Sequence, residues 1–272
     1  MRFSIVTISF NQGQYLEQAI RSVLSQSEDV EYIIVDPGSN DGSRDIINRY
    51  GSRIKVIYGP DRGPADGLNK GFMLATGDVF GYINADDFYL SGCLARVNKA
   101  FQTYADVDII YGHGYICDGQ NKMIRHFRSD TFSLSSYSFG AGIVMQQSTF
   151  FRRGAWLRTS GFNIHNRTSW DGELMVDFAR AGLKMRRVNE YWSVFRIHPE
   201  SITGSQNIKD QCKLDMAMVI KKIRGRDDAG IEKMMQLLIL RERIFKWMRD
   251  PITPLLRMWD ILSINRKKIE PV

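Results

Sequence analysis

Short apolar segments alternate, over the first hundred residues, with segments in which apolar residues recur every three or four positions. The apolar segments are rich in β-branched residues and predict strands at 3–9, 31–36, 54–58 and 78–84. The segments between and after them predict helices at 14–25, 43–50, 64–76 and 90–104. Such alternation is typical of a parallel sheet with crossover helices. Residues 1–105 are therefore expected to form a nucleotide-binding α/β unit.

After residue 106 the pattern changes to shorter strands and one further helix. Strands are expected at 108–112, 114–117, 123–127, near 146–151, at 185–188 and at 192–197. A serine-rich loop is expected at 129–138, and a helix at 171–181. The mixture predicts that residues 106–205 complete the same α/β domain with a mixed sheet.

The remaining segment, residues 206–272, predicts helices broken at Gly225, Pro251 and Pro254. It carries 15 Lys and Arg against 9 Asp and Glu, whereas residues 1–205 carry 22 against 21. A basic amphipathic helical appendage suits an anionic membrane surface. Docking on the preceding α/β domain, or on a second copy of the chain in a homodimer, is the favoured interpretation, and it is compatible with membrane contact. Nucleic acid is disfavoured as a partner, because the basic residues accompany no recognisable nucleic-acid-binding module.

Composition narrows the setting of the protein. The 272 residues are 43% hydrophobic, which is enough for a sizeable core. The three cysteines, an odd number without Cys-x-x-Cys spacing, argue against a disulfide framework and a zinc site. No apolar run reaches the ~18 residues of a membrane span. A cytoplasmic protein with reduced thiols, neither exported nor membrane-spanning, is the expectation.

Two adjacent carboxylates, Asp86 and Asp87, follow the apolar run 79–83 in the order Asn84-Ala85-Asp86-Asp87. Like charges at a strand end repel each other, and the pair therefore predicts a divalent cation, Mg²⁺ or Mn²⁺, or a bound proton. Open α/β sheets bind their ligands at these strand ends. Simple helix capping is the alternative, but it does not account for two acids and an amide behind a buried strand.

Other predicted strand ends carry polar residues as well. Asp36 ends the second strand ahead of a tight turn, where its carboxylate can accept a hydrogen bond from a nucleobase N–H. A role as a turn residue is the alternative. The loop 59–66 precedes a helix whose first N–H groups suit phosphate or sugar hydroxyls, with Arg62 and Lys70 either adding positive charge or facing solvent.

Several motifs then occur in one order along residues 3 to about 205. They are Ser4-Ile5-Val6-Thr7 with Asn11, Asp36-x-Gly-Ser-x-Asp-Gly-Ser, Asp61-x-Gly-x-x-Asp-x-x-Asn-Lys-Gly, Asn84-Ala-Asp-Asp, Trp170-Asp-Gly-Glu and His198-Pro-Glu-Ser. In this order they resemble a family 2 glycosyltransferase of the GT-A fold. The resemblance implies a GT-A catalytic domain at residues 1–205, with a nucleotide-sugar-binding half at 1–105 and an acceptor-binding half at 106–205.

The resemblance also implies ligands and the residues that bind them. The donor would be a nucleotide sugar, a UDP-sugar by resemblance, held by Thr7, Asn11, Asp36, Asp66, Asn69, Asn84, Ala85 and Asp86. A divalent metal, Mn²⁺ or Mg²⁺, would be held by Asp86, Asp87 and His198. Asn84 departs from the family pattern, which often has an acid there, and its amide can still bond a ribose hydroxyl.

Asp171 matches the family position of the catalytic base. In inverting transfer this carboxylate takes the proton of the acceptor hydroxyl from about 2.6–3.2 Å. The alternative is that Asp171 and Glu173 merely favour the positive end of a helix dipole. By analogy the acceptor is a glycan or a lipid-linked molecule.

Two other classes of protein fit this sequence less well. A nucleotidyltransferase on a similar sheet would carry a glycine-rich, arginine-bearing loop after the first strand, whereas residues 11–14 hold one glycine and no arginine. A non-catalytic sugar-nucleotide binder would lack the base, and Asp171 is present. We therefore expect an inverting, metal-dependent glycosyltransferase of surface polysaccharide or glycolipid synthesis, cytoplasmic and peripheral at the inner face of the plasma membrane.

Overall fold

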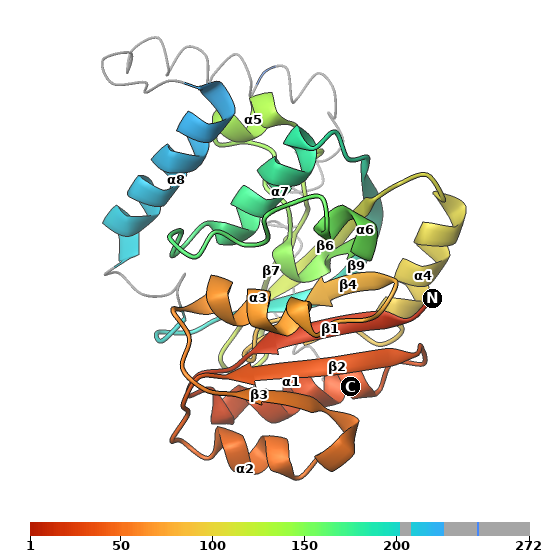
Figure 1. Cartoon of the computed structure of the whole chain (residues 1–272), viewed down its shortest axis with the longest axis vertical. Coiled ribbons are helices and arrows are strands. Elements are labelled where there is room, and N and C mark those ends of the chain that lie inside the picture. Colours follow the sequence, from red (N-terminus) through yellow and green to blue (C-terminus); the bar gives the residue numbers. More distant parts are fainter. Residues whose placement is uncertain (202–207, 226–243, 245–272) are drawn as a thin grey trace.

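One mixed sheet with helices on both faces forms the centre of the computed structural model, which describes residues 1–201, 208–225 and 244 (Figure 1). The strands are β1 (Phe3–Ile8), β2 (Val30–Asp36), β3 (Lys55–Tyr58), β4 (Val79–Tyr82), β5 (Phe88–Tyr89), β6 (Ile109–Asp118), β7 (Met123–Phe127), β8 (Thr149–Arg152) and β9 (Met185–Ile197). Their order is β3-β2-β1-β4-β8-β6-β9-β5, and β7 pairs with β6. Strands β1 to β4 are parallel, and β8 is antiparallel to both neighbours. The predicted mixed α/β fold is confirmed.

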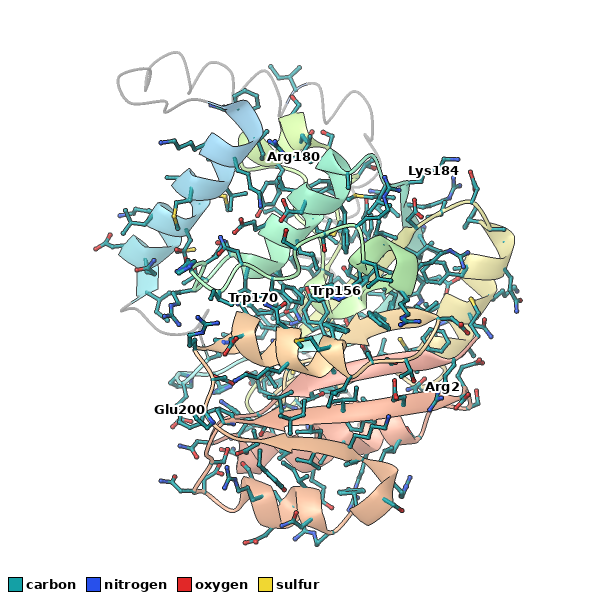
Figure 2. The ribbon with its side chains drawn as sticks, in the orientation of Figure 1. Arg2, Trp156, Trp170, Arg180, Lys184 and Glu200 are labelled. Carbon is teal, nitrogen blue, oxygen red and sulfur yellow. The ribbon has the colours of Figure 1, made fainter. Side chains whose placement is uncertain are left out.

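Helices cover both faces of this sheet. They are α1 (Gly13–Leu24), α2 (Ser43–Asn48), α3 (Pro64–Met73), α4 (Cys93–Thr103), α5 (Leu134–Ser138), α6 (Arg153–Trp156), α7 (Trp170–Arg180) and α8 (Lys209–Arg224), with 3₁₀ turns at Gly51–Arg53 and Gln146–Ser148. Side chains alternate across each strand, so Ile5 packs with α1 and α4, whereas Val6 packs with α3. Trp156 and Trp170 belong to the α3 side and lie close to that helix in Figure 2.

Two pairs of predicted strands are single long strands in the structure. The segments 108–112 and 114–117 form β6, and 185–188 and 192–197 belong to β9. The two long strands run parallel, with register shifts around His113. Their close approach needs Gly112, where an added Cβ would lie 2.7 Å from a backbone oxygen of β9. Gly112 thus permits the pairing of β6 with β9.

A buried carboxylate joins the first three strands at their amino ends. Glu31 on β2 accepts hydrogen bonds from Ser4 Oγ at 2.5 Å, Lys55 Nζ at 2.6 Å and the backbone N–H of Thr76 at 2.7 Å. Burial acts to raise the pKa of Glu31, but these hydrogen bonds outweigh it and lower the pKa to about 2. The ionised form is therefore the one that the fold stabilises.

We expect Glu31→Gln to lower the free energy of unfolding by about 2 kcal/mol at pH 7, measured by urea denaturation. The folded-state pKa lies below the unfolded value, so this stabilisation is present above pH 4.5 and disappears as the pH falls towards 2. The two proteins should therefore converge in acid. A difference that stayed constant from pH 7 to pH 2 would contradict the assignment.

The helix α8, which opens the basic C-terminal region, docks on the α/β domain. Figure 1 shows it beside α5 and α7, where Val219 packs with Tyr137 and Val176. Lys222 forms ion pairs with Glu173 at 2.9 Å and with Asp177 at 2.6 Å. The docking interpretation therefore holds for α8, while the helices predicted after Gly225 lie outside the described residues. Across residues 1–201 and 208–225, no helix is long and apolar enough to cross a bilayer.

Candidate active site

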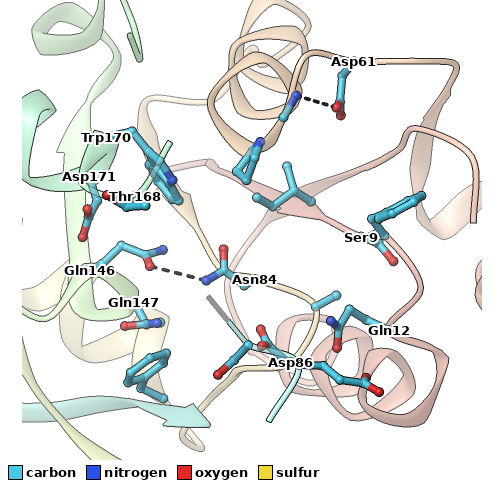
Figure 3. A pocket seen from close by; sticks show the side chains of 18 of the residues that line it. Ser9, Gln12, Asp61, Asn84, Asp86, Gln146, Gln147, Thr168, Trp170 and Asp171 are labelled. Atoms are coloured by element: carbon cyan, nitrogen blue, oxygen red, sulfur yellow. Dashed lines mark hydrogen bonds between the residues drawn. The ribbon is translucent and has the colours of Figure 1, made fainter. Parts of the chain in front are cut away.

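A cavity of about 750 Å³ opens where β1, β2 and β4 end (Figure 3). The residues that line it include Ser9, Gln12, Pro37, Asp61, Asn84, Ala85, Asp86, Gln146, Gln147, Thr168, Trp170 and Asp171. The first strands of the sheet thus contribute one wall, and residues 143–147 with the start of α7 contribute the other. The structure brings the predicted residues Asn84, Ala85, Asp86 and Asp171 to this one cavity.

Asp36 lies at the end of β2, directly before the lining residue Pro37, and its side chain is fully buried. Its Oδ1 atom accepts hydrogen bonds from the N–H groups of Gly38 at 3.0 Å and Ser39 at 2.9 Å, and from Arg44 Nε at 3.0 Å. Its Oδ2 atom is buried without a partner among the described residues. An unpaired buried acceptor is costly, so this oxygen suits a donor supplied by a ligand, such as a nucleobase N–H.

Asp87 is completely buried, and protein donors occupy both of its oxygens. Oδ1 accepts from the N–H of Arg196 at 2.8 Å, and Oδ2 accepts from Gln147 Nε2 at 2.7 Å and from Asn84 Nδ2 at 3.2 Å. Burial, with the negative charge of Asp86 added to it, raises the pKa of Asp87 well above its usual range. These contacts equip Asp87 to hold the segment after β4 in place, and they give no support to the predicted role as a metal ligand.

Asn84 is oriented by the same contacts. Its amide nitrogen faces Asp87, while its Oδ1 atom is buried without a donor among the described residues. A free amide acceptor in the wall of the cavity suits a ribose hydroxyl. The asparagine that departs from the family pattern therefore still presents an oxygen towards a ligand.

Asp86 and His198 are the residues that could hold a divalent metal. The Oδ2 atom of Asp86 lies 3.0 Å from His198 Nε2, and the imidazole packs on the Tyr15 ring at 4.8 Å between centroids. Among the residues that the structure describes, no group of three or more His, Cys, Asp or Glu forms a metal cage. Mg²⁺ often takes one or two carboxylates and completes its shell with substrate phosphates and water. This pair fits a metal that arrives with a diphosphate.

Arg196 is a residue of the site that the sequence analysis missed. Its buried guanidinium donates hydrogen bonds to the backbone oxygen of Asp86 and to Gln18 Oε1, and it lies 4.4 Å from the centroid of the Tyr15 ring. A buried cation here offsets part of the repulsion between Asp86 and Asp87. The sequence feature that could have identified Arg196 is the position of this arginine within the apolar end of β9, two residues before His198.

Asp171 begins α7, and its carboxylate faces the cavity. Burial raises its pKa, against the opposing effect of the backbone N–H groups of Gly172 and of Asp171 itself. No side chain of the described residues donates a hydrogen bond to it. Gly172 permits this arrangement, because a Cβ at that position would collide with the hydroxyl of Tyr137. Asp171 thus has a carboxylate of raised proton affinity that can accept a hydrogen bond from a ligand.

Glu173 has a structural role in the same helix. It is buried and accepts hydrogen bonds from Asn163 at 3.1 Å, from Asn166 at 2.8 Å and from Lys222 at 2.9 Å. These donors satisfy both carboxylate oxygens. Of the two acids at the start of α7, Asp171 is therefore the one available for chemistry.

The structure does not bring Thr7 or Asn69 to the cavity. Thr7 shares the α1 face of β1 with Ile5, and its hydroxyl lies 3.0 Å from the Tyr32 hydroxyl. The Asn69 side chain forms two hydrogen bonds with the backbone of Phe162. Its Nδ2 atom donates to the carbonyl oxygen at 2.8 Å, and its Oδ1 atom accepts from the N–H at 2.9 Å. Their predicted role in donor binding has no support in this geometry, because other parts of the protein already engage both polar groups.

Asn11 and Asp66 shape neighbouring loops. Asn11 adopts a left-handed conformation, with φ of 51°, and its Oδ1 atom accepts from the N–H of Asn40 at 2.9 Å. Asp66 accepts a hydrogen bond from the N–H of Arg62 at 3.0 Å. Burial acts to raise the pKa of Asp66, but this hydrogen bond and the nearby cations outweigh burial and lower that pKa. Asp61, in the same loop as Asp66, lines the cavity instead, and burial raises the pKa of Asp61. Neither Asn11 nor Asp66 is among the lining residues, so their predicted contact with the donor is not seen.

A buried acid on α8 supports the segment that leads to Asp171. Asp215 accepts hydrogen bonds from the N–H groups of Arg167 at 2.9 Å and Thr168 at 2.8 Å, and from the Thr168 hydroxyl at 2.7 Å. Thr168 lines the cavity three residues before Asp171. Helix α8 is therefore part of the framework of the site, a role that the sequence analysis missed because Asp215 belongs to no motif.

We expect Asp215→Ala to lower the free energy of unfolding by about 2 kcal/mol, since two backbone donors would lose their acceptor. Urea denaturation measures the change. The exposed Asp210 on the same helix supplies the control, and Asp210→Ala should leave stability within about 0.5 kcal/mol of the wild type. Equal effects of the two substitutions would show that Asp215 does not anchor the segment.

The fold and the cavity define a glycosyltransferase of the GT-A class. A mannosyltransferase from Pyrobaculum calidifontis, solved with GDP-Man and Mn²⁺, superposes over 96% of this chain and 80% of its own, with a TM-score of 0.62 and 16% identity. TarS of S. aureus, residues 1–349 with UDP, superposes over 91% of this chain and 72% of its own, with a TM-score of 0.63 and 14% identity. The chain spans 43% of a longer TarS structure.

Sequence comparison gives the family. The model of Glycosyl transferase family 2 matches residues 4–164, and the chain belongs to this family. An uncharacterized glycosyltransferase of Nostoc sp. is 31% identical over 244 residues, which cover 79% of this chain and 73% of that protein. A PGL/p-HBAD biosynthesis glycosyltransferase of Mycobacterium bovis is 32% identical over 178 residues, which cover 62% of this chain and 67% of its own.

Proposed function

We propose that the protein transfers a sugar from a nucleotide-diphosphate sugar, a UDP-sugar in the first instance, to an acceptor hydroxyl with inversion at the anomeric carbon. One observation carries the proposal. Asp171, which has no side-chain hydrogen-bond donor among the described residues, presents a carboxylate of raised pKa to the cavity that Asn84 and Asp86 also line. Direct displacement requires a base on one side of a cavity and a donor-binding wall on the other.

In this proposal two unpaired oxygens bind the nucleoside: one belongs to Asn84 in the wall of the cavity, and the other to Asp36, which lies next to the lining residue Pro37. Asp36 Oδ2 accepts a base N–H, and Asn84 Oδ1 accepts a ribose hydroxyl. Asp86 and His198 would hold a divalent cation, which would supply positive charge to offset the charge of the diphosphate. UDP in the TarS structure, and GDP-Man with Mn²⁺ in the mannosyltransferase structure, support a donor and a metal of this kind.

Asp171 then acts on the acceptor. Its carboxylate takes the proton of the acceptor hydroxyl as that oxygen bonds to the anomeric carbon, and the bond from this carbon to the diphosphate oxygen breaks on the opposite side. The products are a glycoside, a nucleoside diphosphate and a protonated Asp171, which returns its proton to solvent. The raised pKa makes Asp171 a stronger base than an ordinary surface aspartate.

We infer that the acceptor is a glycan or a lipid-linked molecule and that the protein works at the cytoplasmic face of a membrane. The basic excess of residues 206–272 supports a contact with anionic lipid. The name of the mycobacterial relative, which refers to PGL/p-HBAD biosynthesis, supports a role in a biosynthetic route.

A panel of UDP- and GDP-sugars tests the proposal. With Mn²⁺ present, at least one member should be hydrolysed or transferred, and EDTA should abolish the reaction. Proton NMR of the first product formed should show the anomeric configuration opposite to that of the donor. Failure to bind or turn over any nucleotide sugar, or retention of configuration, would refute it.

A further inference from the structure

A second, smaller cavity of about 220 Å³ adjoins the first one on the far side of Asp171. The two share four lining residues, which are Ile143, Val144, Gln146 and Asp171. The side cavity, as we call it, is lined in addition by Tyr82, Phe132, Tyr137, Gly142, Thr149, Ser169, Gly172, Leu174, Met175, Phe178 and Met216. The two cavities therefore lie next to each other at these four residues, one of which is the candidate base.

Most of its wall is aromatic or aliphatic. The hydroxyl of Thr149 is satisfied, because it donates to the backbone oxygen of Met145 at 2.8 Å. For scale, an engineered apolar cavity of about 150 Å³ in another protein stays dry and takes up benzene. The side cavity is thus large enough for a six-membered carbon ring, and it offers such a ring an apolar surrounding.

Polar groups without partners gather where the two cavities meet. Gln146 lies between Asp171 and Asn84 in Figure 3, and its Nε2 atom is buried with no acceptor among the described residues. Asp171 offers the complementary carboxylate without a side-chain donor. An alcohol both donates and accepts a hydrogen bond, so this donor and this acceptor together match one hydroxyl group.

We propose that the side cavity binds an apolar ring or branched hydrocarbon group next to the reacting hydroxyl of the acceptor. The hydroxyl lies at the junction, where it donates to Asp171 and accepts from Gln146, while its carbon skeleton fills the cavity. This inference rests on the proposed function, because it takes Asp171 as the base. Of the two acceptor classes in the proposed function, it selects a lipid-linked molecule whose reacting hydroxyl lies beside an apolar group, and it excludes a glycan with hydroxyls on every side.

A pair of substitutions on α8 tests the proposal in the full chain. Met216 lines the side cavity only and is partly buried, so Met216→Trp fills the cavity from its outer wall. Met218, on the same helix, is 46% exposed and lines neither cavity, so Met218→Trp is the matched control. Cyclohexylmethanol and methyl α-glucoside, offered at equal concentration with a nucleotide sugar that the wild type turns over, are the probes.

We expect the wild type and Met218→Trp to transfer sugar to cyclohexylmethanol at least about tenfold better than to methyl α-glucoside. Met216→Trp should lower transfer to cyclohexylmethanol by about tenfold and leave donor hydrolysis by water within about twofold. Equal use of the two acceptors by the wild type, or an undiminished preference in Met216→Trp, would overturn the proposal.

Toluene binding, measured by calorimetry, separates this proposal from the proposed function. Toluene should bind the wild type and Met218→Trp but not Met216→Trp, whether or not a donor is present. Sugar transfer without toluene binding would overturn the proposal that the side cavity binds an apolar group, and it would leave the proposed function intact. Binding without turnover of any nucleotide sugar would overturn the catalytic role, and with it the acceptor assignment.

Discussion

Asp171→Asn should lower the rate of sugar transfer by about 10²–10⁴-fold while the affinity for the nucleotide sugar stays within about twofold of the wild type. The substitution keeps the shape of the side chain and removes its ability to take a proton. Asp171 belongs to α7, whereas the candidate donor-binding residues Asn84 and Asp86 follow β4, so we expect donor binding not to depend on the charge of Asp171. Initial rates with saturating acceptor, and donor titration by calorimetry, measure the two quantities.

The pH dependence provides a second readout of the same residue. Burial raises the pKa of Asp171 above the usual 3.8, so the transfer rate should fall with acid at a pH above 3.8. The rate of Asp171→Asn should lack this acidic limb. Because the ionised form is the one that folding disfavours, the substitution should not lower the free energy of unfolding at pH 7.

Asp177→Asn is the control for this experiment, since Asp177 lies on the same helix and pairs with Lys222 away from the cavity. Its transfer rate should stay within about threefold of the wild type. Wild-type transfer by Asp171→Asn would remove Asp171 as the base and, with it, the observation on which the proposed function rests.

Asp86→Ala should weaken Mn²⁺-dependent binding of the nucleotide sugar by about a hundredfold. The substitution removes the carboxylate that the site offers to a metal and leaves His198 as a single ligand. Calorimetric titration of the nucleotide sugar with Mn²⁺ and with EDTA separates the metal-dependent part of the affinity. In EDTA the variant and the wild type should bind alike.

His198→Ala provides the graded comparison. Loss of a neutral imidazole removes one ligand but no negative charge, so we expect a decrease of about tenfold in the same titration. If Asp86→Ala binds the donor with undiminished Mn²⁺ dependence, the metal is held elsewhere and the assignment of Asp86 fails.

The position of several site residues could be predicted because local sequence determines it. Asp36 and Asp86 follow apolar runs, and the carboxyl ends of parallel strands meet at one edge of a sheet. Asp171 opens a helix whose start is marked by polar residues. Adjacent strands and helix starts are properties of short segments, so motifs alone could single out Asn84, Asp86 and Asp171, which line one cavity in the structure.

The partner of each side chain could not be predicted in the same way. Asn69 and Phe162 are 93 positions apart, and only the approach of their loops shows that the amide is already bonded. Thr7 belongs to a motif, yet strand alternation turns it to the α1 face of the sheet. Arg196 and Asp215 belong to no motif, although they support Asp86 and the segment before Asp171.

The sequence by itself determined the α/β class, the strand ends that carry acids and the chemistry that those acids can perform, because these follow from patterns within a few residues. Only the tertiary structure decided which polar groups remain free for a ligand, that α8 belongs to the framework of the site, and that an apolar cavity lies behind Asp171. Hydrogen bonds and cavities form between segments far apart in the chain, and their geometry exists only once those segments pack together.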